Sequence, residues 1–444
     1  MSKSGPEASG TPTVEPEPRR AAPRGALALT RDRNFGPYIL GKLIAHCSMW
    51  IESIAAAVFM FELSGGSAFM VGTVSIVQFA PQLLLAVWSG ALNDRVDRRK
   101  LLMFGRTLSA TGTAFLGVRL LVAGESGFGG PGVLLAGMLV VGVGVAFSVP
   151  GMQAIVPSLV PDADLEQALA LNAAAPSMAR TVGPAVGAGI LALGGPGLAF
   201  AVGAAGHAVF VILLLFVRAR PHERAGGRSS PWGGFRYLWS DRVSGWLVLG
   251  VAVLGFAADP VLTLAPSLAV HLGGDSALVG ILASAFGAGA LLSALGVSSL
   301  RNVLRLDTIG VAGFVAMVGG WLLVAVSSIV WLTVIGFGMA GSGFMGSTVA
   351  LNTTLHRRVP DELRGRVMAL WGVAFLGSRP IAAAMNGAIA DLATIEIALF
   401  VTAGIAAVTA LKVRAALSAS QISGSAATTT RPRRSSPPRA GPGA

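Results

Sequence analysis

The sequence predicts an all-α membrane protein with twelve transmembrane helices in two pseudo-symmetric six-helix halves. Three observations carry this prediction: the composition is strongly apolar, apolar segments recur along the chain, and basic residues are confined to alternate connections. Hydrophobic residues make up 53% of the 444 residues and charged residues only 12%. Soluble domains average about 25% charged residues, so this chain has too little polar surface for a water-soluble body.

The apolar segments are long enough to span a bilayer, which requires about 20 residues. The polar, Pro-rich ends, 1–33 and 417–444, are predicted to be disordered tails. Residues 34–217 would form the N-terminal half and 243–416 the C-terminal half, joined by a basic linker at 218–242. The predicted spans cover residues 37–63, 68–92, 101–123, 131–156, 165–194, 197–217, 243–272, 276–300, 307–327, 329–355, 364–392 and 394–415.

The distribution of Lys and Arg predicts the orientation of these spans. In a twelve-span arrangement, 28 of the 33 basic residues fall in the tails and connections of one side, and the connections of the other side contain none. Basic residues accumulate on the cytoplasmic side of membrane proteins. We therefore expect both termini to be cytoplasmic. The net charge of +12 is then explained by basic residues that set the membrane orientation and face anionic lipid. It does not indicate nucleic-acid binding.

The chain also repeats itself weakly. The segment "LSGGSAFMVG" (63–72) is echoed by "LGGDSALVG" (272–280), and "VPD" occurs at Val160 and again at Val359, 199 residues later. Each echo lies at the same place in its predicted six-span half. Two repeated helical halves with a cavity between them form a transporter architecture.

A short charged run, "GALNDRVDRRKLL" (90–102), interrupts the apolar sequence between the second and third spans. It resembles the signature loop of the major facilitator superfamily, although Asp97 stands where Gly is usual. The resemblance implies that this loop latches the two halves in the outward-facing state. Gly90 would allow close helix packing and Asp94 would bind a neighbouring helix N-terminus or an Arg. A loop that only sets the topology is the alternative. The gating candidates are Gly90, Asp94, Arg95, Arg98 and Arg99.

The resemblance extends from about Asn34 to Arg414 and is similar to the branch that includes the enterobactin exporter and related drug effluxers. It rests on "QFAPQLLLAVWSGALNDRVDRRKLL", "LVPDADLEQALALNAAAPSMARTVGPAVGAGI" and "VPDELRGRVMALWGVAFLG". In the fifth span Gly183, Pro184 and Gly187 resemble the antiporter signature, which bends and thins the helix where the halves meet. Ala188 replaces a Gly of that signature. The basic residue that many proton antiporters carry in the fourth span is absent, which weakens the inference of proton coupling by the usual route.

Four charged residues are predicted to lie near mid-membrane. Arg180 and Arg379 are separated by 199 residues and Glu52 and Asp259 by 207, so each set is a repeat-related pair. Buried charges are costly unless they are paired or hydrated. We therefore expect the ion pairs Glu52–Arg180 and Asp259–Arg379, either as neutral structural pairs or as coupling and substrate-binding groups. Lys42 and Arg106, nearer helix ends, are expected to snorkel toward the membrane surface.

The first, fourth, seventh and tenth spans are expected to line the cavity. Polar or aromatic residues there, and in the eleventh span, are candidates for substrate contact, although each also fits ordinary helix packing. His46 and Trp50 share one helix face at a spacing of four residues. The cavity candidates are His46, Trp50, Gln153, Asn352, Trp371 and Asn386.

Other motifs indicate no chemistry. "GPYILGKL" (36–43) approaches a phosphate-binding loop, but Leu43 stands where Ser or Thr should reach magnesium, and no strand precedes it. No nucleophile and base are spaced as in an enzyme, and no His or Cys set has metal-ligand spacing. We expect neither a cofactor nor a metal.

The sequence therefore predicts a secondary transporter of the bacterial inner membrane. It would export a small amphipathic organic compound, such as a drug, siderophore or secondary metabolite, by alternating access coupled to protons. We expect a monomer whose partners are its substrate, protons and membrane lipid. A lysophospholipid or lipid translocator on the same fold is the alternative, and a non-transporting membrane sensor or scaffold is a third reading.

Overall fold

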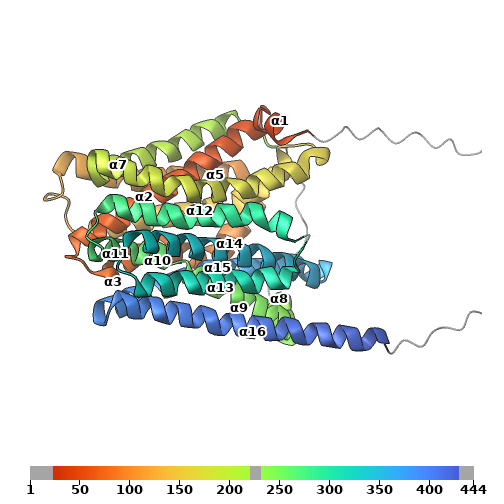
Figure 1. The fold of residues 1–444 in the computed structure, drawn as a ribbon. Helices are drawn as coiled ribbons and strands as arrows, with labels where there is room; N and C mark the ends of the chain where they lie inside the picture. The colour runs from red at the N-terminus through yellow and green to blue at the C-terminus, as the bar shows by residue number, and fades with distance from the viewer. Residues whose placement is uncertain (1–23, 221–231, 302, 430–444) are drawn as a thin grey trace, which may run out of the picture.

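The computed structural model describes residues 24–220, 232–301 and 303–429, and these residues form α-helices with two short 3-10 turns and no strand. Within these described residues, ten helical segments are long and apolar enough to cross a membrane. The all-α class is confirmed, and the chain is a multi-pass membrane protein. The helices run roughly parallel to one axis (Figure 1).

The first half contains seven helices. Two 3-10 turns, at Val156–Ser158 and Asp162–Asp164, join the fourth span to the fifth. The helices are α1 (Ala26–Thr30), α2 (Phe35–Leu63), α3 (Ala68–Leu84), α4 (Ala86–Arg95), α5 (Arg98–Ala123), α6 (Pro131–Ala154) and α7 (Leu165–Phe216).

The described part of the second half contains nine helices. It comprises α8 (Trp232–Ser240), α9 (Arg242–Ala257), α10 (Pro260–Thr263), α11 (Ala265–His271), α12 (Ser276–Leu300), α13 (Leu306–Val326), α14 (Val330–Arg358), α15 (Asp361–Leu392) and α16 (Ile395–Thr429).

Two predicted spans are interrupted in the structure, and two others are joined in one helix. At 52 residues α7 holds the fifth and sixth spans, which meet at Gly194 and Gly195 with non-helical backbone angles. The second span is divided at Leu85 into α3 and α4. The seventh is divided before Pro260, which has no N–H to continue a helix. With α7 counted as two spans and Ala68–Leu84 as a shorter one, the structure is consistent with twelve spans.

The ends of the chain are more ordered than predicted. Within the expected tail, Arg24 donates two hydrogen bonds to Asp164, 2.8 Å from its backbone N and 2.7 Å from Nε. The expected linker contains α8, and α16 continues to Thr429, past the predicted boundary at 416. The predictions for 1–23, 221–231 and 430–444 fall outside the described residues. The ordered part of the chain begins earlier than predicted, at Arg24, because Arg24 binds the distant Asp164. A local sequence pattern does not reveal such a contact.

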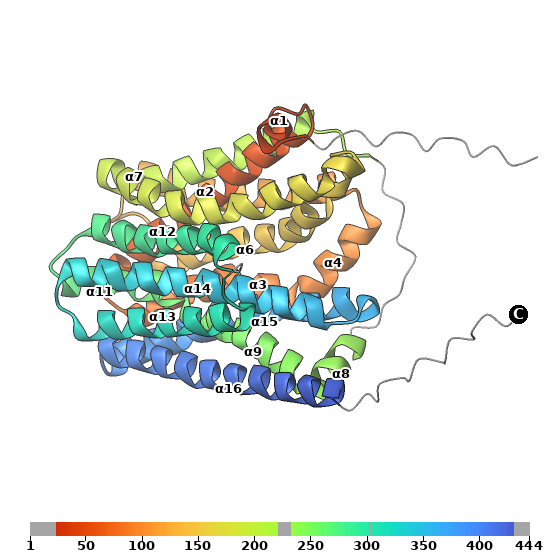
Figure 2. The same cartoon turned by 45° about the vertical axis from the view of Figure 1, so that its right-hand side comes forward.

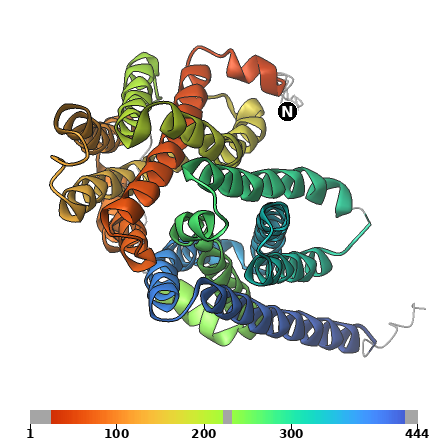
Figure 3. The same ribbon diagram turned by 60° about the vertical axis from the view of Figure 1, so that its left-hand side comes forward.

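The two halves lie side by side, with α2 to α7 on one side and α9 to α16 on the other (Figure 3). They touch mainly along two pairs of helices, α3 with α15 and α7 with α12, with smaller contacts of α10 and α11 on the first half. At both contacts the glycine that closes the repeated segment permits the close approach. A Cβ on Gly72 would lie 2.5 Å from the Ala383 carbonyl oxygen, and one on Gly280 would clash with the Cβ of Ala188. The repeat therefore marks equivalent contacts between the halves.

One end of the molecule carries most of the described arginines, which lie near the ends of α4, α8, α12 and α14. This basic end includes α1 and α8 (Figure 1). There α4 tilts away from the helices around it (Figure 2). The basic end provides a reference for the positions of the sites below.

Candidate functional site

A small cavity lies between the halves, near the middle of the bundle. Its lining includes Arg180 from α7 together with Asp259 and Arg379 from the second half, so three of the four predicted mid-membrane charges share one site. Its volume of about 10 Å³ is close to the room needed by one water molecule. The remaining lining includes Trp50, Phe79, Ala258, Val261, Leu262 and Phe286.

Asp259 sits where the seventh span is interrupted. Its Oδ1 accepts a hydrogen bond of 3.0 Å from Thr263 Oγ1, and its Oδ2 accepts one of 2.9 Å from Asn386 Nδ2. Asn386 in turn accepts a hydrogen bond of 2.8 Å from Thr402. The break frees the carbonyl of Ala257, which accepts from Trp321 Nε1 at 2.8 Å. Interrupted helices of this kind build substrate and ion sites in transporters.

Both arginines point across the boundary between the halves and stack on phenyl rings. The guanidinium carbon of Arg180 lies 4.9 Å from the ring centre of Phe344, and that of Arg379 lies 4.8 Å from Phe79. Neither has a carboxylate within ion-pair distance among the described residues, and the Nε atom of each is buried without a hydrogen-bond partner. Stacking of a cation on an aromatic face is worth about 2 kcal/mol when desolvated. It leaves the N–H groups free for an acceptor.

An aromatic ladder on α15 continues from Arg379. Phe375 lies one turn earlier and its ring centre is 5.8 Å from the guanidinium carbon of Arg379. Trp371, a further turn away, stacks on Phe375 at 5.6 Å with an angle of 16° between the rings. Phe344 lies 6.0 Å from Phe375 and 5.6 Å from Phe286. The cavity itself is lined by Trp50 and Phe79 from the first half and Phe286 from the second. The rings of Phe344, Phe375 and Trp371 extend this aromatic surface beyond the cavity.

The predicted ion pairs are not formed. The first and fifth spans do pack together, as do the seventh and eleventh, but Arg180 points toward the second half and Glu52 into the first. Asp259 and Arg379 line the same cavity without a direct ion pair. The expectation was wrong because helix adjacency alone does not define the direction of a side chain.

Glu52 instead belongs to a hydrogen-bonded cluster inside the first half. Its Oε2 accepts a hydrogen bond of 2.6 Å from Thr113 Oγ1 and lies 3.3 Å from His207 Nε2. Glu52, Thr113 and His207 are all fully buried. The cluster links the first, third and sixth spans inside the first half.

A second polar cluster lies in the same half, closer to the basic end. Lys42 Nζ donates to the Asn172 backbone carbonyl at 2.9 Å, and Tyr38 donates to Asn172 Oδ1 at 2.9 Å. The guanidinium carbon of Arg106 lies 5.9 Å from the ring centre of Phe210. Lys42 and Arg106 are each 1% exposed, so the expectation that they snorkel was wrong. Asn172 binds Lys42 instead. Arg106 contacts Phe210 and the sulfur of Met152, and its Nε and Nη1 are buried without a hydrogen-bond partner among the described residues.

The other cavity candidates are dispersed. His46 Nδ1 contacts the Lys42 carbonyl oxygen of its own helix at 2.8 Å, and Gln153 Oε1 accepts from Asn172 at 3.3 Å. Only Trp50 among the six candidates lines the central cavity. Asn352 Oδ1 and Trp371 Nε1 are buried without a hydrogen-bond partner in the described structure.

The loop after α4 is tied to the first half. Arg98 donates to the Ala154 carbonyl at 2.7 Å, and Arg99 donates to the Leu214 carbonyl at 2.7 Å, so both hold the ends of neighbouring spans. Asp97, the departure from the signature, caps α5 by accepting from the N–H groups of residues 99 and 100. The side chain of Asp94 lies outside the described residues. Gly90 has open space around it, so the expected close packing there is not formed.

The Gly-Pro segment of the fifth span has two faces. Gly183 and Gly187 permit close packing on α2, where added Cβ atoms would lie 2.7 Å from Trp50 and 3.1 Å from Ile51. Pro184 and Ala188 instead face Gly280 of α12 across the boundary. The segment therefore lies at the predicted interface, although its glycines contact the first half.

Sequence reasoning missed the phenyl rings that support the arginines. One signal could have revealed Phe79, which stacks on Arg379, together with Phe286, which lines the cavity, because the two are separated by 207 residues, the same offset as Glu52 and Asp259. Phe344 and Phe375 have no such signal, since apolar rings in membrane helices are abundant.

Comparisons with known proteins agree with this arrangement. The family described as transmembrane secretion effector matches residues 25–436. Enterobactin exporter EntS of Citrobacter koseri is 26% identical over 371 residues, which cover 81% of this chain and 86% of the relative. EntS of Escherichia coli O127:H6 is 26% identical over 377 residues with the same coverage.

Solved structures show the same fold at low sequence identity. The nucleoside transporter NupG superposes with a TM-score of 0.68 at 14% identity, over 86% of this chain and 98% of NupG. An inward-facing bacterial homologue of the iron transporter ferroportin gives a TM-score of 0.66 at 15% identity, over 85% of this chain and 98% of the homologue.

Proposed function

The chain belongs to the transmembrane secretion effector family of major facilitator transporters, and we propose that it exports a small amphipathic organic compound in exchange for protons. The candidate substrate classes are drugs, siderophores and secondary metabolites. The named activity of the relatives, enterobactin export, supports outward transport of a metabolite. The fold and family exclude the sensor and enzyme readings.

The observation that carries the substrate proposal is the pair Arg180 and Arg379. Two guanidinium groups face one cavity without carboxylate partners, on a wall of aromatic rings. Guanidinium N–H groups bind carboxylate, phenolate or phosphate oxygens, and the rings pack on a flat apolar body. An anionic compound with an aromatic portion fits both features.

The size of the cavity indicates how such a compound is moved. A volume of about 10 Å³ admits no organic molecule, so binding requires the halves to separate on one side. The helix pairs α3–α15 and α7–α12 would act as pivots, and α4 with the 90–99 loop as the mobile element at the basic end. We assign the latch role to Gly90, Asp94, Arg95, Arg98 and Arg99 within this cycle.

Proton coupling is assigned to the buried carboxyl groups. Glu52 is linked to His207 and Thr113 inside the first half, and Asp259 lies beside Arg379 in the cavity. An ionised carboxylate in the bilayer interior is costly, so a change in its protonation shifts the preferred packing of its neighbours. Entry of an anionic substrate at Arg379 would also bring a second negative charge into the cavity that Asp259 lines.

We place the protein in the bacterial inner membrane as a monomer with both termini cytoplasmic. The concentration of arginines at the basic end supports this orientation.

Transport in proteoliposomes with an imposed pH gradient tests the proposal. An aromatic carboxylate and its uncharged amide analogue would be compared in the wild type, Arg180→Gln, Arg379→Gln and the exposed control Arg236→Gln. We expect each cavity variant to lower kcat/KM for the carboxylate by about tenfold or more, because a charge-assisted contact is worth about 1.5–3 kcal/mol. The control should match the wild type. Equal transport of carboxylate and amide, or selective movement of a lysophospholipid, would refute the proposal, the latter in favour of a lipid translocator.

A further inference from the structure

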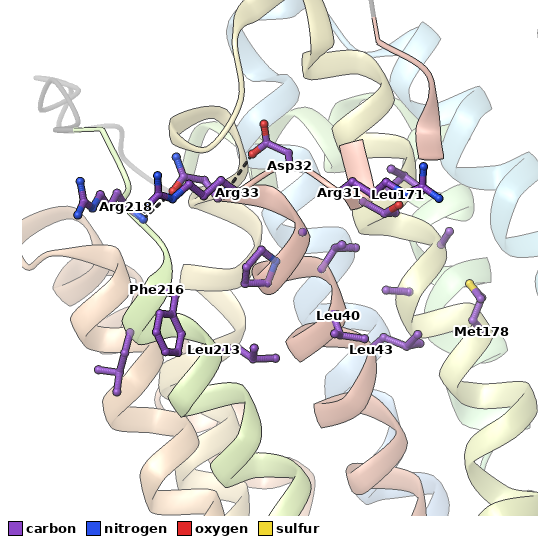
Figure 4. Close-up of a pocket in the computed structure, with 18 residues that line it drawn as sticks. Arg31, Asp32, Arg33, Leu40, Leu43, Leu171, Met178, Leu213, Phe216 and Arg218 are labelled. Carbon is purple, nitrogen blue, oxygen red and sulfur yellow. Dashed lines mark hydrogen bonds between the residues drawn. The ribbon is translucent and has the colours of Figure 1, made fainter. Parts of the chain in front are cut away.

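A second, larger cavity lies on the outer surface of the first half, next to the basic end. Its volume is about 1050 Å³. It is enclosed by the 30–34 segment above, the beginning of α2 behind, and the two arms of α7 on either side (Figure 4). We call it the α2 groove. It shares no residue with the central cavity.

The groove opens toward the surroundings of the bundle. Met178 lines it, whereas Arg180, two residues later on the same helix, faces the second half. Residues two apart on a helix point about 200° apart, so the groove and the boundary between the halves are on opposite faces of α7. Apolar side chains in the groove are exposed, with Leu40 at 52% and Phe216 at 65%. In a membrane protein such a surface faces lipid.

The upper edge of the groove is cationic. Arg31, Arg33 and Arg218 lie there (Figure 4), are exposed, and have no carboxylate within ion-pair distance among the described residues. The backbone N–H of Arg218 donates to Asn34 Oδ1 at 3.1 Å. This bond joins the end of α7 to the start of α2, so the edge is preformed.

The one acidic residue in the groove is already engaged. Asp32 accepts from Arg24 Nη1 at 2.9 Å and from the backbone N–H groups of Asn34 and Phe35 at 2.9 and 3.0 Å. Burial alone would raise the pKa of Asp32, but these hydrogen bonds hold it below its usual value. The carboxylate therefore stays ionised and bound to Arg24, and it leaves the three edge arginines uncompensated.

We propose that the α2 groove binds an anionic glycerophospholipid from the leaflet at the basic end. The phosphate would lie on Arg31, Arg33 and Arg218, and the acyl chains would follow the apolar wall below. That wall is formed by Leu40, Leu43, Leu171, Met178, Leu213 and Phe216.

The order of chemical groups selects a lipid over a soluble ligand. Cationic groups at the membrane boundary with apolar side chains directly beneath reproduce the order of headgroup and chain. The groove faces the bilayer, where an anionic lipid is present at high local concentration and is attracted by clustered arginines. A bound lipid would bridge the first, fifth and sixth spans at the basic end, a structural role beyond the transport proposed above.

Binding can be measured on the purified full-length chain in a neutral detergent. Native mass spectrometry and thermal unfolding would follow titration with phosphatidylglycerol and, separately, phosphatidylcholine. We expect phosphatidylglycerol to remain bound and to raise Tm by several degrees more than phosphatidylcholine does. The triple variant R31Q/R33Q/R218Q should lose this difference, with affinity reduced at least tenfold.

A matched control removes the same charge elsewhere. R236Q/R242Q/R414Q replaces three exposed arginines outside the groove and should keep the preference for phosphatidylglycerol. The substitution Ala174→Trp fills the apolar part of the groove while leaving the arginines intact, and it should also weaken binding. If the triple variant does not fold, the three single variants provide the same comparison.

Three outcomes would overturn the proposal. The two lipids could stabilise the wild type equally, the control triple could lose the preference as fully as the groove triple, or Ala174→Trp could bind phosphatidylglycerol as the wild type does. Displacement of the lipid by a transported compound would instead identify the groove as a substrate entrance. Because binding is read without transport, failure here leaves the proposed export activity untouched.

Discussion

The carboxylate of Asp391, near the end of α15, accepts a hydrogen bond of 2.5 Å from the hydroxyl of Ser67, the N-cap residue of α3. The same carboxylate accepts from the backbone N–H groups of Ala68 at 2.7 Å and Phe69 at 3.1 Å. A residue of the second half thus caps a helix of the first half, where the helix dipole favours negative charge. The bond lies at the end opposite the basic end and clamps the halves together there.

Loss of this clamp should favour opening of that end. Asp391→Ala removes three charge-assisted hydrogen bonds at a partly exposed site. We expect the closed form to lose about 1.5 kcal/mol, about tenfold in the equilibrium. Spin labels at Ser64 and Ala393, in a background with Cys47 replaced, would report a longer distance between the halves. Asp275→Ala is the control, because Asp275 caps its own helix through Ala277 N–H at 2.9 Å. Unchanged distances in Asp391→Ala would show that other contacts hold this end closed.

The contact between α7 and α12 should be sensitive to a single methyl group. Gly280→Ala places a Cβ against that of Ala188, and overpacking of this kind costs about 1–3 kcal/mol. We expect lower Tm or slower transport, and recovery in the exchange variant Gly280→Ala with Ala188→Gly. Gly189→Ala, with open space around it, should behave as the wild type. A double variant no better than the single would contradict the proposed crossing point.

The buried Glu52 cluster should separate folding from coupling. Glu52→Gln keeps the shape and an oxygen that can accept from Thr113, so we expect an inserted, folded protein. Without a titratable carboxyl at this position, transport should no longer accelerate when a pH gradient is imposed. Thr113→Val removes one hydrogen bond but keeps the carboxyl, and it should retain the response. A normal gradient response in Glu52→Gln would assign coupling elsewhere, with Asp259 the next group to test.

An ion pair at the basic end predicts a pH-dependent stability. Asp241 accepts from Arg358 Nε at 2.7 Å and from Ser244 at 2.6 Å. Burial would raise the pKa of Asp241, but these bonds together lower it to about 2. The Asp241 carboxyl therefore binds a proton more weakly in the folded state than in the unfolded chain, where its pKa is about 3.9. The stabilisation is complete above that value and is lost as pH falls toward 2.

The variant Asp241→Asn tests this dependence when its Tm is measured against pH. It should lower Tm at pH 7, and the difference from the wild type should shrink as the pH falls below about 4. Ser240→Ala, beside the pair, is a control without a change in charge. A difference in Tm that is constant down to pH 2.5 would show that the Asp241 charge does not contribute through this ion pair.

Reporter fusions test the orientation. A reporter active only in the periplasm should give no signal when fused after residue 420 and a strong signal when inserted at Gly127, between the third and fourth spans. The reverse pattern would invert the topology, and signal at both sites would contradict the odd number of spans, nine, predicted between them.

Much of the architecture could be predicted from the sequence. Span positions follow from apolar segments of bilayer length, because each span must satisfy its own backbone hydrogen bonds in lipid. The echo at Gly72 and Gly280 led to the two equivalent contacts between the halves, since only glycine allows such an approach.

The partners of the charged residues depended on tertiary structure. Offsets of 199 and 207 residues predicted that Arg180 and Arg379, and likewise Glu52 and Asp259, are repeat-related. The two members of each set have different partners. Glu52 turned inward to Thr113 and His207, whereas Asp259, at a helix break, reached Asn386 and the cavity. A helix period places a side chain on a face, and the rotation of each helix in the bundle decides what that face meets.

The sequence by itself determined the membrane class, the spans, the two related halves and the chemistry available within them, because bilayer thickness and backbone hydrogen bonding act locally along the chain. Only the tertiary structure decided that Lys42 and Arg106 are buried, that two arginines share an aromatic cavity, and that three others border the α2 groove. Those outcomes depend on packing between segments more than 100 residues apart, and the free energy of a buried charge depends on the neighbours that such packing supplies.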